Sequence, residues 1–242
     1  MKIAQVVTMA SVLMMPIAVH AEEMSDARVK ELVLEAIREN PGIVLEAVQI
    51  IEQRKQERQA ANAKMVLSDN RSLLENDPNA PVLGNPEGDV TVVEFFDYNC
   101  PYCRRAKPHI EALLEEDPNV RLVYREWPIL GEGSVFAAKA ALASREQGKY
   151  EEFHWALMGM QGRAEEASVM RIAEEIGLDV AQLRRDMQAP EIDSHLAGSM
   201  EMSRALGFNG TPSFVIGDAL VPGVIETDEM IRLVKEARAE KE

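Results

Sequence analysis

Residues 90–103 read VTVVEFFDYNCPYC, and they place a short cysteine pair directly behind an apolar run. The run 90–96 is rich in β-branched and aromatic residues, which is typical of a buried strand. Helical spacing then extends over residues 101–116, and the turn-forming residues 117–119 end it. Residues 120–127 alternate well enough for another strand. The order strand, helix, strand predicts an α/β protein with the cysteines at the first turn of a βαβ unit.

The chain has two cysteines, Cys100 and Cys103, and the loop between them is too small for a disulfide to stabilise a fold. We expect Cys100 at a helix N-cap and Pro101 at the first helical position, where a missing N–H costs nothing. The N–H groups of the first turn and the helix dipole favour a negative sulfur, so the pKa of Cys100 should lie below its free value of about 8.5. Cys100 is then the sulfur that attacks or is attacked, and Cys103 resolves the mixed disulfide.

Two other interpretations of the pair are an inert disulfide and half of a metal site. Zinc needs further Cys or His ligands, and His109, His154 and His195 show no recognisable ligand spacing. Copper(I) held by two thiolates stays open as a side activity. Redox exchange is favoured because the pair lies between a strand and a helix, and we predict no cofactor and no metal site.

Glu94 and Pro212 are the other candidate residues, and the residue pattern leaves both open. A carboxylate amid apolar neighbours is either buried, with a raised pKa and a role in proton exchange with Cys103, or exposed at the end of the strand. Pro212 precedes a short strand, and most X–Pro bonds are trans, with cis in about 5–6% of cases. The sequence alone therefore describes Pro212 as an ordinary loop proline.

Residues 1–21 have the features of a secretory signal peptide. Lys2 supplies a basic start, residues 3–19 are apolar, and Val19-His20-Ala21 offers small residues for cleavage. A membrane anchor is the alternative, but the run is near the lower limit for spanning a bilayer and an acidic stretch follows it. We expect an exported, periplasmic protein that is soluble after cleavage.

Composition supports one sizeable folded domain with an accessory segment. Hydrophobic residues make up 46% and charged residues 28%, which excludes disorder throughout. The formal net charge of −15 disfavours nucleic acid and anionic membrane surfaces as partners.

Residues 22–65 alternate apolar and charged side chains at helical spacing. Asn40-Pro41-Gly42 interrupts the pattern, and residues 53–64 are almost wholly polar. This predicts two short amphipathic helices and a polar helical stalk. Short isolated helices are marginal in water, so another surface must cover them. That surface is either the same segment of another subunit or the protein's own catalytic domain, and the stalk favours a homo-oligomer.

The remaining chain divides into a linker, a helical block and a late hairpin. Turn residues over 65–88 indicate a linker, with a domain boundary near residue 66 and a possible short edge strand at Val82-Leu83. Residues 134–206 are helical in pattern. Two short strands follow over 212–221, and Thr227 is expected to cap a last helix that ends near residue 239.

Three motifs together resemble the bacterial DsbA family: FFDYNCPYC (residues 95–103), REWPILG (125–131) and GFNGTPSF (207–214). The resemblance spans residue 82 to the end. It implies a thioredoxin-like fold interrupted by a helical domain at about 132–200, so the predicted domains are 1–21, 22–65 and 66–242. It also implies a cis loop at Thr211-Pro212 beside the cysteines, so Pro101, Tyr102, Thr211 and Pro212 are expected to bind substrate. Glu94 matches the buried acid of the family.

Two departures separate the chain from the prototype oxidase of that family. Tyr102 stands where the prototype has histidine, and threonine precedes Pro212, which looks more like the periplasmic isomerases. The amphipathic segment 22–65 looks like that of ScsC, the suppressor-of-copper-sensitivity subgroup, whose members can oligomerise through it.

These observations predict a protein disulfide isomerase or oxidase that acts on cysteines of exported proteins. A membrane redox partner would recycle the dithiol and decide the direction of exchange. The alternative is a thiol-dependent copper-binding or chaperone protein without redox turnover. Thirteen methionines are compatible with copper binding, but those between residues 158 and 202 lie at helical spacing and are more often core residues.

Overall fold

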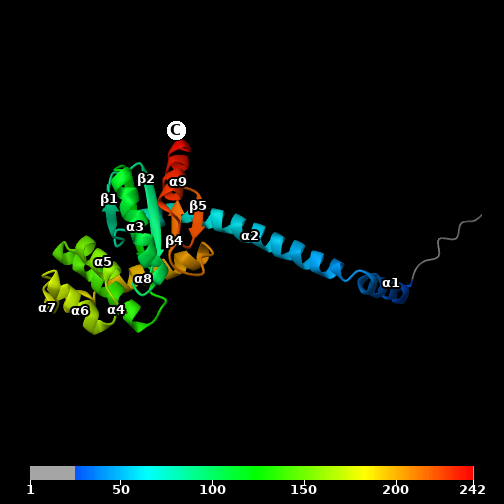
Figure 1. The fold of residues 1–242 in the computed structure, drawn as a ribbon, viewed down its shortest axis with the longest axis horizontal. Helices are drawn as coiled ribbons and strands as arrows, with labels where there is room; N and C mark the ends of the chain where they lie inside the picture. The colour runs from blue at the N-terminus through cyan, green and yellow to red at the C-terminus, as the bar shows by residue number, and fades with distance from the viewer. Residues whose placement is uncertain (1–24, 242) are drawn as a thin grey trace, which may run out of the picture. The chain divides into compact units, whose positions relative to one another are not determined.

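The computed structural model describes residues 25–241, so the predicted signal peptide at 1–21 lies outside the described residues. A five-stranded sheet has the order β1-β3-β2-β4-β5 (Figure 1). Its strands are β1 Val82–Gly84, β2 Val90–Phe96, β3 Val120–Glu126, β4 Ser213–Ile216 and β5 Ala219–Pro222. β2 and β3 are parallel, and the other neighbouring strands pair antiparallel.

The predicted βαβ unit is confirmed. β2 leads into α3, Pro101–Glu116, which returns to β3 in register with β2 from Val90 against Val120 to Phe96 against Glu126. Side chains of β2 alternate between two cores, as a strand requires. Val92 and Phe96 face the core that contains α3 and α9, Thr227–Ala239, whereas Val93 and Phe95 face the core on the other side of the sheet.

Six helical segments separate β3 from β4, which confirms the predicted helical insertion. They are α4 Glu132–Ala143, the 3-10 helix η1 Ser144–Gln147, α5 Tyr150–Gly159, α6 Glu166–Glu175, α7 Val180–Asp186 and α8 Pro190–Ala205. Because α8 continues to Ala205, the insertion ends a few residues later than expected. The methionines of this block at 158, 160, 170, 187 and 202 are buried.

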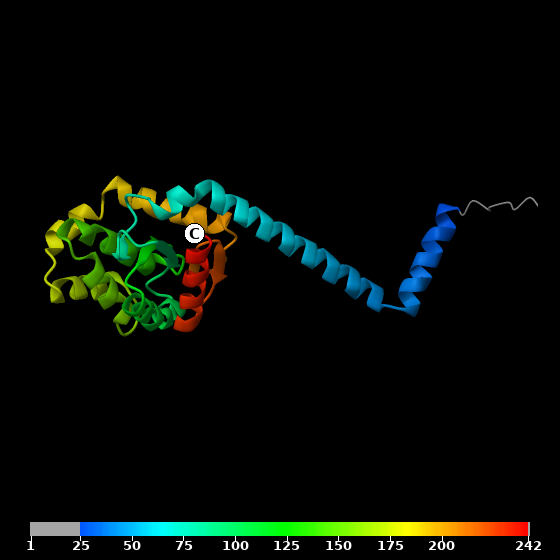
Figure 2. The ribbon, with the colours of Figure 1, turned by 90° about the horizontal axis from the view of Figure 1, so that it is seen from above.

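The predicted linker starting at Met65 was wrong over its first part. Two helices precede the sheet, α1 Asp26–Glu39 and α2 Gly42–Glu75, so the expected second amphipathic helix, the stalk and the start of the linker form one helix. The helix continues because Leu67 and Leu74 are buried against the sheet, while the turn-forming residues between them lie on its outer side. Figure 2 shows this end of α2, in cyan, beside α8.

The chain divides into two compact units, residues 1–54 and 55–242, so the expected boundary at residue 66 falls within α2. We call residues 26–54 the arm and residues 55–241 the catalytic unit. The break at Asn40-Pro41 is present as predicted, and so is the edge strand at Val82. Thr227 is the first residue of α9 rather than its cap, because Glu226 occupies the N-cap. Among the described residues, no helix combines the length and apolarity that a membrane crossing requires.

Candidate active site

Cys100 occupies the N-cap of α3, as expected, and Pro101 begins the helix. The side chain is 3% exposed, and the thiol Sγ donates to the carbonyl oxygen of Thr211 at 3.1 Å. Both cysteines are free thiols, so the structure represents the reduced dithiol. The first sulfur of the pair therefore lies between the start of α3 and the residue before Pro212.

The pKa of Cys100 is lowered to about 6. The largest cause is a hydrogen bond with Cys103, which burial opposes; bonds from the Thr211 side chain and from the backbone N–H groups of Cys103 and Tyr102 add to it. The helix start thus contributes as expected, but the second thiol contributes more. At neutral pH Cys100 is mainly a thiolate, which is both the attacking form and a good leaving group.

Cys103 has the opposite tendency. Burial raises the pKa of this thiol well above its ordinary value, and the hydrogen bond to Cys100 and the charge of Glu94 raise it further. Cys103 therefore keeps its proton while Cys100 is ionised, and the two sulfurs are prepared for different steps.

Glu94 is buried, which decides between the two positions that the sequence left open. It is 1% exposed and lies on the same face of β2 as Val92 and Phe96, towards α3. Burial, followed by the charge of Cys100, raises the pKa of Glu94 well above its ordinary value. Its Oε1 has no hydrogen-bond partner among the described residues, so the carboxyl has capacity left for a proton.

The peptide bond between Thr211 and Pro212 is cis, as the family resemblance implied. The carbonyl oxygen of Pro212 accepts from the N–H of Gly223 at 2.8 Å, which ties this loop to the end of β5. Thr211 is partly exposed and its carbonyl meets Cys100. The expected substrate-binding residues at 211 and 212 are thus brought beside the reactive sulfur.

Tyr102 lies at the surface beside the same sulfur. Its side chain is 53% exposed, and the guanidinium of Arg105 lies 4.3 Å from the centre of its ring. Pro101 is exposed as well. The two residues between the cysteines are therefore accessible to a partner protein, while both sulfurs are almost covered.

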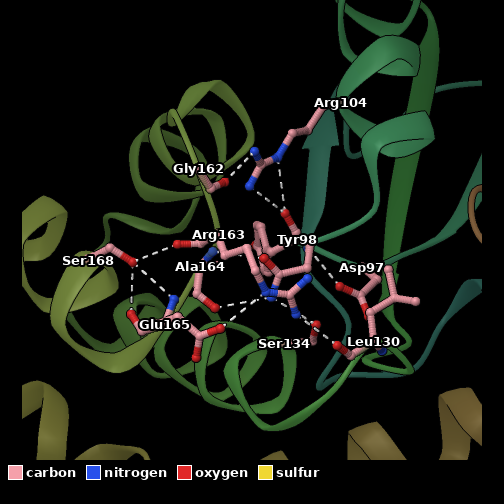
Figure 3. Close-up of polar contacts among 11 residues, drawn as sticks. Asp97, Tyr98, Arg104, Leu130, Ser134, Gly162, Arg163, Ala164, Glu165 and Ser168 are labelled. Atoms are coloured by element: carbon pink, nitrogen blue, oxygen red, sulfur yellow. Dashed lines mark hydrogen bonds and ion pairs between the residues drawn. The ribbon is translucent and has the colours of Figure 1, made fainter.

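Three polar residues around the cysteine pair were not predicted: Asp97, Asn99 and Arg104. The Asp97 carboxylate accepts from the N–H groups of Asn99, Ile129 and Leu130 at 2.7, 2.8 and 2.9 Å. Asn99 and Arg104 bind the loop between α5 and α6, as Figure 3 shows for Arg104. The residues of this loop that they bind lie 56–65 residues away in the chain, so no local sequence pattern predicts these contacts.

The buried histidines have structural partners. His154 Nδ1 lies 3.0 Å from the Tyr98 hydroxyl, and burial lowers its pKa to about 3. His195 lies between Glu126 and Asp77, at 2.7 and 3.3 Å. Within residues 25–241, no group of three or more His, Cys, Asp or Glu side chains is arranged to hold a metal ion.

The fold is shared with known proteins, and the matched range includes this site. The family model of the DSBA-like thioredoxin domain matches residues 91–235, which contain the cysteine pair, the helical insertion and Pro212. A thioredoxin-like oxidoreductase from Silicibacter pomeroyi DSS-3 is 69% identical, with 70% of this chain and 98% of that chain covered and a TM-score of 0.70.

Two further structures extend the comparison. A linker-deletion mutant of Proteus mirabilis ScsC is 28% identical, with 91% of this chain and 99% of that chain covered and a TM-score of 0.69. A periplasmic thioredoxin-like protein from Salmonella enterica serovar Typhimurium is 29% identical, with 70% and 95% covered and a TM-score of 0.62.

The curated relatives are longer proteins, and the chain spans between about a fifth and a quarter of their length. The Na(+)/H(+) antiporter NhaA 3 of Salinispora tropica is 34% identical over 137 residues, which are 56% of this chain and 21% of that protein. The family match over more than half of the chain shows that the protein belongs to the DSBA-like thioredoxin domain family, and the structures that it resembles include ScsC and a thioredoxin-like oxidoreductase.

Proposed function

We propose that the protein reshuffles disulfides in exported proteins in the periplasm, with Cys100 as the attacking sulfur. The observation that carries the proposal is the difference in acidity between the two thiols. The pKa of Cys100 is lowered to about 6, while that of Cys103 is raised. A thiolate that is stable at neutral pH attacks a partner disulfide and later leaves from it.

The exchange begins when the Cys100 thiolate attacks one sulfur of a partner disulfide. A bond forms between Cys100 and that sulfur, the partner's S–S bond breaks, and the other sulfur leaves with the electron pair and takes up a proton. In reshuffling, another partner thiolate then attacks the mixed disulfide, which forms a new partner disulfide and returns Cys100 as a thiolate. No net oxidation or reduction occurs.

Cys103 provides the escape from a mixed disulfide that does not rearrange. It loses its proton, attacks Cys100, and releases the partner as a dithiol, which leaves the pair oxidised. Glu94 receives this proton, because two negative charges repel each other at a buried site. When Cys103 becomes a thiolate, the neighbouring carboxylate, whose pKa is raised, takes up the proton. A membrane redox partner would then reduce the pair again.

Thr211 and Pro212 hold the partner chain during exchange. The loop containing them lies beside Cys100, so a partner strand that pairs with this backbone has its sulfur next to the thiolate. Exposed Tyr102 and Pro101 form the opposite side of the contact.

The arm supports reshuffling by more than one copy of the chain. Its large apolar residues are exposed, among them Val33 at 52%, Leu45 at 62% and Ile51 at 59%. An isolated helix with such a face gains free energy from being covered, and the same face of another copy complements it. We propose that the arm, which lies within the predicted oligomerisation segment 22–65, forms this contact and presents several dithiols to one partner.

The periplasmic location rests on the predicted signal peptide and on the Salmonella relative named above. The alternative is a thiol-dependent copper-binding or chaperone protein without redox turnover. The methionines at 158, 160, 170, 187 and 202 do not support its copper-binding form, because they are buried in the core.

Rescue of a scrambled-disulfide substrate tests this function. We compare the full chain, a chain beginning at Lys55, and Cys100→Ser. The start at Lys55 keeps Leu67 and Leu74 in place, which a start at residue 66 would endanger. We expect full rescue from the full chain, none from Cys100→Ser, and oxidation without reshuffling from the shortened chain.

A point variant separates the arm's association from its length. Ile51→Lys places a charge on the apolar face, which also carries Val44 and Val48, and Gln49→Lys places the same charge on the opposite, polar side of the same helix. Ile51→Lys should lower both the sedimentation coefficient and the reshuffling rate, and Gln49→Lys neither. A monomeric wild type, or equal reshuffling by the chain from Lys55, excludes the role of the arm.

A further inference from the structure

The cysteine pair is bracketed by two polar residues that both bind one distant loop. Asn99 precedes Cys100 and Arg104 follows Cys103. The loop is formed by residues 160–165, which connect α5 to α6 in the helical insertion. We call it the α5–α6 loop.

Asn99 binds this loop through both ends of its amide. Its Nδ2 donates to the carbonyl oxygen of Ala164 at 3.0 Å, and the N–H of Ala164 donates back to Oδ1 at 2.8 Å. The same Nδ2 lies 3.1 Å from the Ser134 hydroxyl at the start of α4. The two-way bond fixes the register between the residue before Cys100 and the insertion.

Arg104 binds the other end of the loop. Its Nη1 donates to the carbonyl oxygens of Met160 at 3.2 Å and Gly162 at 2.7 Å. Nε and Nη2 both donate to the carbonyl oxygen of Tyr98, at 3.2 and 3.0 Å. Gly162 has a φ of 79°, which a residue without Cβ adopts readily, so the loop can turn its carbonyl towards Arg104.

These bonds leave the charge of Arg104 without a carboxylate at hydrogen-bond distance in the described chain, because each of them ends on a main-chain carbonyl. The nearby Asp97 carboxylate is occupied by three backbone N–H groups. Arg163 is a further cation close to Arg104 and bonds to Glu165 and to the carbonyl of Leu130. A cation without a bonded carboxylate is not neutralised by a counter-charge, so it still acts on other charges nearby.

The closest change of charge in the reaction is at Cys100. The backbone N–H of Arg104 bonds to the carbonyl of Cys100 at 3.2 Å, so the two residues are adjacent across the first turn of α3. Burial and the charge of Arg163 lower the pKa of Arg104, whereas the charges of Asp97 and, more weakly, Cys100 raise it, so the guanidinium lies within electrostatic range of the Cys100 sulfur.

We propose that Arg104 is a positioning residue for thiol–disulfide exchange: it holds the α5–α6 loop against the cysteine pair and supplies a fixed positive charge beside the Cys100 thiolate. This inference rests on Cys100 being the attacking sulfur. It adds that one side chain attaches the helical insertion and also favours the thiolate, alongside the hydrogen bond from Cys103, with Asn99 as an uncharged second attachment.

Titration of the reduced full chain by ultraviolet thiolate absorbance tests the charge. In Arg104→Gln, the first thiol transition should rise by at least about half a pKa unit, since a nearby opposite charge is lost. In Arg104→Lys, which keeps the charge, it should stay close to that of wild type. Arg105→Gln is the matched control, because it removes the same charge from the next residue, whose guanidinium lies over the Tyr102 ring. Its shift should be less than half of that in Arg104→Gln.

Amide hydrogen exchange in the α5–α6 loop tests the attachment. Both Arg104 variants and Asn99→Ala should speed exchange at Gly162 and Arg163, and only Arg104→Gln should also raise the thiol transition. Unchanged titration in Arg104→Gln, or an equal shift in Arg105→Gln, overturns the electrostatic role, and unchanged exchange in all three variants overturns the attachment.

The same titration separates this inference from the proposed function. A wild type whose first transition lies at the value of an ordinary thiol contradicts the role of Cys100 itself. A low first transition in wild type that Arg104→Gln leaves in place contradicts only the role of Arg104.

Discussion

The two parts of α2 belong to one helix and have opposite surroundings. From Gly42 to Arg54 every residue is exposed, whereas the following part buries Ala63, Leu67 and Leu74. The first part is helical because its residues favour a helix, and the second part continues the helix because Leu67 and Leu74 are buried. The difference teaches that local patterns account for the arm, while tertiary contacts decide where the helix ends and what covers it. It also distinguishes the arm, whose proposed role requires another chain, from the catalytic unit, which contains both cysteines.

The largest expected effect follows from that self-contained chemistry. Cys103→Ser should accumulate mixed disulfides between Cys100 and partner proteins, because the resolving thiol is absent, and Cys100→Ser should form none. Both results should be the same in the full chain and in a chain beginning at Lys55. Non-reducing gels with mass spectrometry of the trapped species provide the measurement. If trapping by Cys103→Ser disappears without the arm, the arm takes part in the exchange chemistry. The distinction between the arm and a self-contained catalytic unit is then wrong.

A pair of leucines on α2 sharpens the comparison in stability. Leu74 is fully buried, so Leu74→Ala should destabilise the catalytic unit by about 3 kcal/mol. Leu45 is 62% exposed, so Leu45→Ala should change that stability by less than about 0.5 kcal/mol. Denaturant unfolding followed by Trp fluorescence measures this, since Trp127 and Trp155, the two tryptophans of the chain, lie in the catalytic unit. Equal effects of the two variants would mean that the arm is packed onto the catalytic unit.

Local patterns were sufficient for the elements that build the site. The run 90–96, the cysteine pair and the helix after it all follow from residues close in the chain, and the structure has them within a residue of their expected bounds. The family resemblance supplied the cis bond before Pro212, which propensity alone opposes. The burial of Glu94 needed the structure, because a strand residue has two faces and the sequence did not say which one α3 covers.

Long-range contacts account for what the sequence did not predict. Ser68, Asp69 and Asn70 are turn-forming residues in isolation, but they lie on a helix whose other side buries Leu67 and Leu74. In the sequence, Arg104 resembles any charged residue on the outer side of a helix. Its proposed role depends on carbonyl oxygens more than fifty residues away in the chain. Such contacts leave no period and no motif in one sequence.

A smaller effect is expected from Glu94→Gln, which keeps the shape and removes the titration. Release of a partner by Cys103 should slow about a hundredfold, since the proton acceptor is lost. The folded pKa of Glu94 is raised, so wild type loses stability as the pH rises above the ordinary carboxyl pKa towards the folded one. Glu94→Gln should lack this loss and be more stable than wild type at neutral pH. Single-turnover release and unfolding at several pH values measure the two effects. A stable variant with an unchanged release rate would exclude Glu94 from proton transfer.

The smallest effect is expected in the pH dependence of Cys100 alkylation. This profile measures how far the acidity of Cys100 depends on Cys103. Alkylation of the reduced chain should rise with a midpoint near the pKa of about 6, with the arm present or absent. The pKa of Cys100 is lower in the folded protein than in the unfolded chain. The reduced protein should therefore gain stability as the pH rises from about 6 towards the ordinary thiol value of 9.0, and lose that stability again as the pH falls back to about 6.

The largest cause of the lowered pKa of Cys100 is the hydrogen bond from Cys103. Cys103→Ala should therefore move the alkylation midpoint upward, while Cys103→Ser, whose hydroxyl can still donate, should move it less. An equal midpoint in all three proteins would assign the acidity to the helix start and to Arg104 instead, and the second cysteine would then serve only to resolve the mixed disulfide.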